Sequence, residues 1–216
     1  MSGGPNAARP RVVFDFAGVL FHWKPLDLLQ HLLPQHATDD ASAAFWAALI
    51  FQGYKGDWAE FDRGTIAPGP LVDRIAVRTG LAHALVKTVV DAVPHSMHAL
   101  PGSVALVEQL RAAGEPLFFL SNMPAPYADV LERANPFLRG FQDGVFSARV
   151  QLIKPEPAIF AHAAQRFGLP PQDLLFFDDV PANVAAARAA GWQAEVFTDA
   201  QQAGADLRAR GFTIPG

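Results

Sequence analysis

Short apolar runs recur along the sequence, separated by longer segments in which apolar residues have helical spacing. Residues 12–14 form the first run and lead into Asp15, and later runs lead into Ser121 and Asp178. Uninterrupted runs of this length are typical of strands that are buried on both faces of a parallel sheet. Because strands and helices alternate across short loops, the pattern predicts an α/β fold with a doubly wound parallel sheet.

Between the first strand and residue 98 the strand-like runs disappear. The predicted helices of this block cover residues 25–33, 40–52, 68–79 and 81–93. Apolar residues of the second helix fall on one face, namely Phe45, Trp46, Leu49 and Ile50. Residues 53–66, rich in aromatic and charged side chains, are predicted to form a surface loop that either packs its aromatic rings or faces a substrate.

From residue 100 the alternation becomes regular. Strands are predicted at residues 116–120, 145–146, 174–177 and 194–197, and helices at residues 101–113, 127–134, 156–167, 181–190 and 199–210. We therefore expect a flexible tail (residues 1–10), a core domain (residues 11–21 and 99–216) and an inserted small helical bundle (residues 22–98).

Composition and charge indicate which kinds of partner the protein can bind. The 216-residue chain is 50% hydrophobic and has a formal net charge of -4, which leaves no basic footprint for nucleic acid. The densest apolar stretch, residues 45–51, is too short to span a bilayer. We expect a small-molecule partner, no nucleic acid and no membrane. The chain contains no cysteine, which excludes disulfides and thiolate nucleophiles and fits a cytoplasmic location.

Polar residues end three of the predicted strands. These are Asp15, Ser121 and the pair Asp178–Asp179, and Lys154 precedes a helix between the last two. Since the carboxyl ends of parallel strands lie along one edge of a sheet, we expect these groups to converge there. Carboxylates can hold Mg²⁺ or attack phosphorus, while a hydroxyl and an ammonium can neutralise phosphate oxygens. The set predicts phosphoryl transfer, although each member alone also fits a helix cap, a turn or a surface residue.

Four segments in this order resemble the motifs of the haloacid dehalogenase-like hydrolase superfamily, namely residues 14–20, 119–122, 154–160 and 176–183. The resemblance spans nearly the whole chain after Pro10 and implies a Rossmann-like core. The helical insert between the first two motifs resembles the small helical cap of one class of this superfamily. Within the insert, residues 63–66 resemble members similar to glucose 1-phosphate phosphatase.

The resemblance implies a role for each matching residue. Asp15 would be the nucleophile that forms an aspartyl-phosphate, and would bind Mg²⁺ together with Asp178 and the backbone carbonyl of Ala17. Lys154 would orient Asp15 and offset the charge of the phosphate. The other members of the implied site are the phosphate-binding Ser121 and Asn122 and the supporting Asp179 and Asn183.

One position departs from the superfamily pattern. Most of its phosphatases carry a second Asp two residues after the nucleophile as general acid and base, where this chain has Ala17. Such a group contributes about 10²- to 10⁴-fold in rate. His22 is our candidate replacement, because it lies at the hinge of the insert and imidazole titrates near neutral pH; the alternative is a polar hinge residue without a catalytic role. Trp58 and Arg63 are predicted to contact substrate, with packing of the insert as the alternative.

Three other functions stay open at this stage. Carbon–halogen hydrolases of the superfamily also lack the second Asp, but they need no metal. A phosphonoacetaldehyde hydrolase would form a Schiff base on a lysine of the insert, for which Lys55 is available. A non-catalytic binding protein would fit Ala17 and also Gln151, where relatives usually have glycine. Our prediction is a Mg²⁺-dependent phosphomonoester hydrolase for a small phosphorylated metabolite such as a sugar phosphate; the oligomeric state is not predicted.

Overall fold

The computed structural model describes residues 9–214 of the chain. Its strands form one parallel sheet in the order β3-β2-β1-β4-β5. The strands are β1 (Arg11–Phe14), β2 (Leu117–Ser121), β3 (Asp143–Phe146), β4 (Leu174–Asp178) and β5 (Gln193–Val196). Since the order runs outward from β1 in both directions, the predicted doubly wound α/β fold is confirmed.

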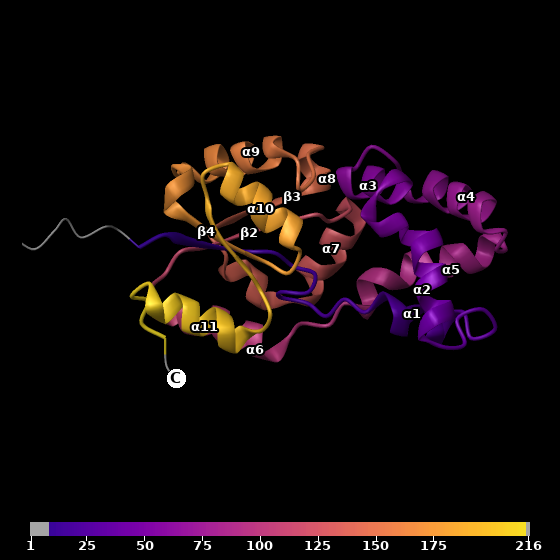
Figure 1. Cartoon of the computed structure of the whole chain (residues 1–216), viewed down its shortest axis with the longest axis horizontal. Helices are drawn as coiled ribbons and strands as arrows, with labels where there is room; N and C mark the ends of the chain where they lie inside the picture. Colours follow the sequence, from indigo (N-terminus) through magenta and orange to yellow (C-terminus); the bar gives the residue numbers. More distant parts are fainter. Residues whose placement is uncertain (1–8, 215–216) are drawn as a thin grey trace, which may run out of the picture.

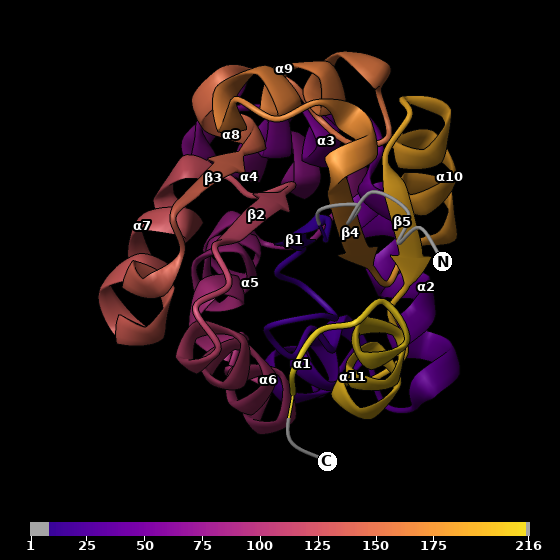
Figure 2. The ribbon, with the colours of Figure 1, turned by 90° about the vertical axis from the view of Figure 1, so that its left-hand side faces the viewer.

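Helices cover both faces of this sheet (Figure 2). On one face lie α6 (Pro101–Ala112) and α11 (Ala200–Ala209), and on the other α9 (Pro157–Phe167) and α10 (Pro181–Ala189). Successive residues of a strand point to opposite faces. Val12 therefore packs in the hydrophobic cluster on the α6 side, and Val13 packs in the cluster on the α9 side. The core also contains α7 (Ala125–Ala134), η2 (Pro136–Gly140), α8 (Ser147–Val150) and η3 (Pro171–Asp173).

A second group of helices, which we call the cap (residues 22–98), lies at one end of the molecule (Figure 1). Its elements are α1 (Pro25–Leu32), α2 (Asp40–Phe51), η1 (Gln52–Tyr54), α3 (Gly56–Arg63), α4 (Pro68–Thr79) and α5 (His83–Ser96). The predicted helices are confirmed with small shifts at their ends. The predicted apolar face of α2 is only partly buried, since Ile50 is fully buried but Phe45 is 59% exposed.

The prediction of a surface loop over residues 53–66 is wrong, because residues 56–63 form α3. Trp58, Phe61 and Asp62 have the spacing i, i+3 and i+4 and are all buried, so they form the inner face of this helix. The many aromatic and charged side chains of the segment therefore belong to an amphipathic helix.

The chain passes between core and cap at two adjacent points. Phe21 and Ala99 form an antiparallel bridge. The backbone N–H of His22 donates to the carbonyl oxygen of His98 at 2.8 Å, and that of Leu100 donates to the carbonyl oxygen of Leu20 at 2.8 Å. These contacts lie at the predicted boundaries of the insert. That core and cap are separate domains stays a prediction.

The predicted tail, residues 1–10, lies for residues 1–8 outside the described residues. Arg9 is held in place, because it donates a hydrogen bond to the carbonyl oxygen of Gly211 at 2.9 Å and forms an ion pair of 2.7 Å with Glu115. Over residues 9–214, every helix is too short or too polar to cross a membrane.

Several contacts dock the cap on the core. The Ser147 hydroxyl in α8 donates a hydrogen bond of 2.5 Å to the carbonyl oxygen of Asp62. The Tyr127 hydroxyl in α7 donates one of 2.6 Å to the carbonyl oxygen of Val90 in α5. Gly64, with φ of 80°, approaches α8 so closely that a Cβ there would lie 2.5 Å from the Ala148 carbonyl oxygen. The end of α3 is thus fixed against the core.

We predict that Gly64→Ala destabilises the protein more than Gly80→Ala does. Both glycines have positive φ, 80° and 71°, so alanine at either position carries a penalty of about 1–2 kcal/mol for the left-handed conformation. Only Gly64 faces a backbone atom, whereas a Cβ at Gly80 would meet nothing within 4 Å. Thermal unfolding of both variants measures the difference. Equal losses would show that the close approach to Ala148 does not matter for stability.

Candidate active site

The order of the sheet brings the predicted site residues together. Ser121 ends β2 and Asp178 ends β4, while Asp15 follows β1 between them and extends its pairing through a 2.9 Å hydrogen bond from its N–H to the carbonyl oxygen of Phe177. Lys154 reaches into this group from the segment before α9. Its Nζ lies 2.8 Å from Asp15 Oδ1 and 2.6 Å from Asp178 Oδ2. The ammonium therefore bridges two buried carboxylates.

Asn122 positions Lys154 through the backbone. The Asn122 amide donates a hydrogen bond of 2.9 Å to the Lys154 carbonyl oxygen, and the Lys154 N–H donates one of 2.8 Å to Asn122 Oδ1. These reciprocal bonds join the end of β2 to the segment that carries the lysine. The ammonium also lies 5.2 Å from the centre of the Phe176 ring, a cation–π contact in a buried setting.

Asp178 is fixed by its own loop. Its Oδ1 accepts a hydrogen bond of 2.8 Å from the N–H of Val180, and both of its oxygens accept bonds of 3.0 Å from the Asn183 amide. Asp179, in contrast, is exposed and lies against Gly18. A Cβ on Gly18, whose φ is 76°, would lie 2.2 Å from Asp179 Oδ2. Glycine is therefore the residue that this turn and this carboxylate can accommodate.

Burial and neighbouring charges shift the pKa values of Asp15 and Lys154 in opposite directions. Burial raises the pKa of Asp15 to about 7; the Lys154 ammonium opposes that shift, and the Asp178 carboxylate adds to it. Burial also lowers the pKa of Lys154, but the Asp15 and Asp178 carboxylates outweigh it and leave that pKa raised. Lys154 is consequently a permanent cation at neutral pH.

The acidic residues fit a divalent cation. Oxygen atoms of Asp15, Asp178 and Asp179 lie within 4.8 Å of one another. Asp15 Oδ1 is buried, and among the described residues its one polar side-chain partner is the Lys154 ammonium. An all-oxygen set open on the side of Asp179 is the type that binds Mg²⁺ with some of its waters. The carbonyl of Ala17 as a further ligand stays a prediction.

Ser121 offers a free hydroxyl to this site. Its side chain is fully buried, and within residues 9–214 its Oγ has no hydrogen-bond partner. A buried hydroxyl without a partner carries a desolvation cost that a bound ligand can remove. Ser121 is thus suited to donate a hydrogen bond to an anionic ligand near Asp15.

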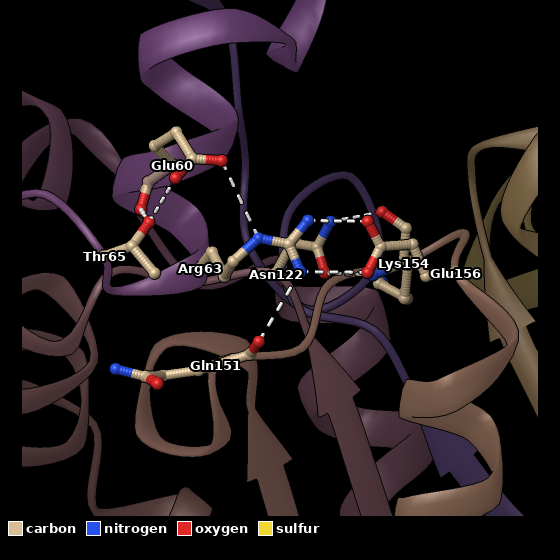
Figure 3. Close-up of polar contacts among 7 residues, drawn as sticks. All are labelled: Glu60, Arg63, Thr65, Asn122, Gln151, Lys154 and Glu156. Carbon is tan, nitrogen blue, oxygen red and sulfur yellow. Dashed lines mark hydrogen bonds and ion pairs between the residues drawn. The ribbon is translucent and has the colours of Figure 1, made fainter.

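The structure gives Trp58 and Arg63 partners within the protein. Trp58 is 3% exposed, and its ring centre lies 4.6 Å from that of Phe51, so it contributes to the core of the cap. Arg63 donates hydrogen bonds of 2.9 Å and 2.6 Å to the two carboxylate oxygens of Glu156, and one of 3.5 Å to the carbonyl oxygen of Gln151 (Figure 3). Contact of Trp58 or Arg63 with substrate stays a prediction.

The side chains of His22 and Lys55 make no hydrogen bond or ion pair with Asp15, Lys154 or Asp178 within the described residues. His22 lines a cavity of about 340 Å³ together with Trp23 and Asp199, and none of Asp15, Lys154 and Asp178 is among the described residues that line it. A catalytic role for His22 stays a prediction. Lys55 is exposed just before α3 begins.

Gln151 occupies a position where relatives usually have glycine, and its backbone adopts a conformation that is typical of glycine. Its φ is 58°, a left-handed conformation in which glycine is the usual residue. The chain keeps the turn before Lys154 although a larger residue occupies it.

Sequence reasoning missed Asp62. This residue lies on the inner face of α3 and is 6% exposed, and among residues 9–214 its side chain has no hydrogen bond or ion pair. Burial raises the pKa of Asp62 to about 8; the Lys154 charge opposes this shift and Asp15 adds to it. An acid at helical spacing from Trp58 and Phe61 would have signalled a carboxyl group on a buried face, had the segment been predicted as a helix.

We predict that Asp62→Asn gains stability relative to wild type as pH rises from about 4 to about 8. In this window the folded state keeps the Asp62 proton that the unfolded chain releases, because the pKa is raised from 3.8 to about 8 on folding. Wild type therefore loses stability as pH rises, and the asparagine variant lacks this loss.

Thermal unfolding of metal-free protein across this range measures the effect as a difference from wild type. Asp27→Asn is the matched control, because the Asp27 side chain is 69% exposed on α1 of the cap. A difference that stays flat with pH for Asp62→Asn would contradict the prediction.

Comparison with known proteins places these residues in a family. The family model of haloacid dehalogenase-like hydrolases matches residues 11–191. The chain is 24% identical over 197 residues to the sesquiterpene phosphatase astK of Aspergillus oryzae, which covers 91% of this chain and 93% of that protein. It is 36% identical over 96 residues to hexitol phosphatase A of Escherichia coli, a match that spans 43% of either chain.

Solved structures share the fold. A predicted haloacid dehalogenase-like hydrolase from Porphyromonas gingivalis has a TM-score of 0.72 at 22% identity, over 96% of this chain and 100% of that one. An enzyme of the same family from Bacteroides thetaiotaomicron, in complex with magnesium and inorganic phosphate, has a TM-score of 0.68 at 18% identity, over 88% and 95%. By its sequence match and its fold, the chain belongs to the haloacid dehalogenase-like hydrolases.

Proposed function

We propose that this hydrolase is a Mg²⁺-dependent phosphomonoesterase that acts on a small phosphorylated metabolite through an aspartyl-phosphate on Asp15. The observation that carries the proposal is the Lys154 ammonium held 2.8 Å from Asp15 and 2.6 Å from Asp178. It places a fixed positive charge beside a carboxylate that can attack phosphorus. The named phosphatases among the relatives support this choice of reaction.

Each residue of the site has a task in this reaction. The Asp15 carboxylate attacks phosphorus, and the bond from phosphorus to the substrate alcohol breaks. The Ser121 hydroxyl, the Asn122 backbone N–H and the Lys154 ammonium bind the phosphoryl oxygens, so that negative charge in the transition state meets donors already in place. Water then hydrolyses the aspartyl-phosphate and releases phosphate.

Asp15, Asp178 and Asp179 would hold the metal ion, whose charge stabilises the phosphoryl oxygens when it is bound. Asn183 and the N–H of Val180 keep Asp178 in its orientation. The exposed side chain of Asp179 completes the cluster on its open side. The acid pair favours this reaction over metal-free carbon–halogen hydrolysis. The complete set of charged groups favours an enzyme over a binding protein.

We propose a sugar or polyol phosphate as the substrate. The match to hexitol phosphatase A, although it spans 43% of each chain, supports this class. A cytoplasmic location and the absence of nucleic-acid partners remain predictions from the sequence.

We predict that Asp15→Asn lowers Mg²⁺-dependent hydrolysis of p-nitrophenyl phosphate by about 10³-fold or more, because the amide is a poor nucleophile. Release of phosphate with and without EDTA measures the reaction. Asp27→Asn, on the exposed side of the cap, is expected to retain wild-type rates. Equal activity of Asp15→Asn and wild type would remove Asp15 as the nucleophile.

We predict that, in a panel of phosphorylated metabolites with Mg²⁺, hexose and hexitol phosphates give a kcat/KM at least about tenfold above phosphoglycolate and prenyl phosphates, a difference of about 1.4 kcal/mol. Phosphate release under identical conditions provides the ranking. A prenyl phosphate at the top would instead assign the substrate class of the sesquiterpene phosphatase.

A further inference from the structure

The proposed reaction needs a proton donor for the leaving group, and no residue described so far supplies one. An alkoxide is a poor leaving group, so the oxygen that departs from phosphorus needs a proton, and Ala17 cannot supply one. Lys154 is committed to Asp15 and Asp178 as an ammonium. The carboxylates of Asp178 and Asp179 belong to the cluster that would hold the metal. A proton donor must therefore come from outside the sheet edge.

The backbone of Asp62 is fixed by contacts with the core. Its carbonyl oxygen accepts the Ser147 hydroxyl at 2.5 Å, and the same Ser147 Oγ accepts the N–H of Met123, two residues after Ser121, at 2.8 Å. The next residues, Arg63 and Gly64, also contact the core. The backbone of Asp62 is thus tied to the loop that follows β2.

Within the part of the chain that the structure describes, the carboxyl group of Asp62 forms no interaction that would explain it as a structural residue. Trp58 and Phe61 share its face of α3, yet the Asp62 side chain is 6% exposed and makes no hydrogen bond or ion pair within residues 9–214. A buried acid with no partner is costly. An acid on an otherwise apolar face therefore points to a function that needs the carboxyl group itself.

Asp62 interacts electrostatically with charged and titratable groups of both the core and the cap. Lys154 and Asp15 act on it from the core, and Asp62 in turn acts on Tyr54 of the cap and Tyr127 of α7. Both phenols have partners: the Tyr127 hydroxyl donates to the Val90 carbonyl oxygen, and the Tyr54 hydroxyl accepts from Trp23 Nε1. Asp62 is therefore an acid of the cap whose charge interacts with those of the nucleophile and its lysine, and its backbone is held beside the loop that follows β2.

We propose that Asp62 is the general acid and base of the reaction and takes the part of the Asp that is missing at position 17. The inference rests on the proposed phosphomonoesterase function.

Asp62 acts in both halves of the reaction. As Asp15 binds phosphorus and the bond to the ester oxygen breaks, the protonated Asp62 gives its proton to that oxygen, and the product leaves as a neutral alcohol. The Asp62 carboxylate then takes a proton from the water that attacks the aspartyl-phosphate, so that phosphate is released and Asp62 is protonated again. Burial keeps the pKa of Asp62 high enough for the acid to carry a proton at neutral pH.

The leaving group provides the test, because p-nitrophenolate departs without a proton and an alkoxide does not. For Asp62→Asn we expect kcat/KM to fall about 10²-fold or more on the best alkyl phosphate of the metabolite panel. On p-nitrophenyl phosphate we expect a much smaller fall in kcat/KM, which reports the transfer of the phosphoryl group to Asp15, together with a lower kcat, because hydrolysis of the aspartyl-phosphate loses its base. Asp62→Glu is expected to restore part of the alkyl phosphatase activity, and Asp27→Asn to match wild type on both substrates.

Several results would overturn the inference. An equal fall on both substrates would make Asp62 a structural or substrate-binding residue, and an unchanged rate on both would remove it from the reaction. A selective loss on the alkyl phosphate in His22→Ala, but not in Asp62→Asn, would assign the proton transfer to His22. A wild-type enzyme that hydrolyses aryl but no alkyl phosphates would show that no leaving group is protonated.

Asp15→Asn separates this inference from the proposed function. If that variant loses both activities while Asp62→Asn shows no selectivity, the phosphomonoesterase stands and the role of Asp62 falls. A second measurement needs no turnover. It follows the side-chain carboxyl ¹³C NMR signal of Asp62, which is assigned as the signal that metal-free wild type shows and Asp62→Asn lacks. We expect this signal to titrate above neutral pH, and titration near the ordinary range of an aspartate would contradict the proposed donor.

Discussion

The site depends on one lysine charge held between two carboxylates inside the protein. Removing Lys154, Asp15 and Asp178 from water carries a desolvation cost that only close geometry can offset, and the distances of 2.8 Å and 2.6 Å show that geometry. Three features of the fold serve it. Strands β1 and β4 are neighbours, the Asn122 amide fixes the lysine backbone, and the Asn183 amide holds Asp178. The rest of the site is arranged around this charge.

Much of this arrangement can be predicted from the sequence. The apolar runs before Asp15, Ser121 and Asp178 identify strands, and parallel strands necessarily place their ends along one edge. Local pattern therefore determines both the sheet and the cluster at its edge. The contacts of the cap could not be predicted in this way. Arg63 pairs with Glu156 across 93 positions of sequence, and no local pattern names the partner of such a residue.

Because residues 53–66 were predicted as a loop, Asp62 was not recognised as a candidate functional residue. Because aromatic and charged residues alternate irregularly there, the segment suggested a loop, and an acid in a loop is ordinarily solvated. As part of α3, the same acid lies on a buried face beside Trp58 and Phe61. His22 lies close to Ala17 in the sequence, whereas Asp62, the buried acid whose charge interacts with that of Asp15, comes from another part of the chain.

Residues 62, 63 and 64 contact the core one after another, through a carbonyl oxygen, a guanidinium and a glycine. Successive residues of an α-helix are turned by about 100° because a turn holds 3.6 residues. A slip of α3 by one position would therefore break all three contacts at once and turn the Asp62 carboxyl group away. The interface accepts a single rotational setting of this helix, so length changes are tolerable before Gly56 or after Thr65 but not between them.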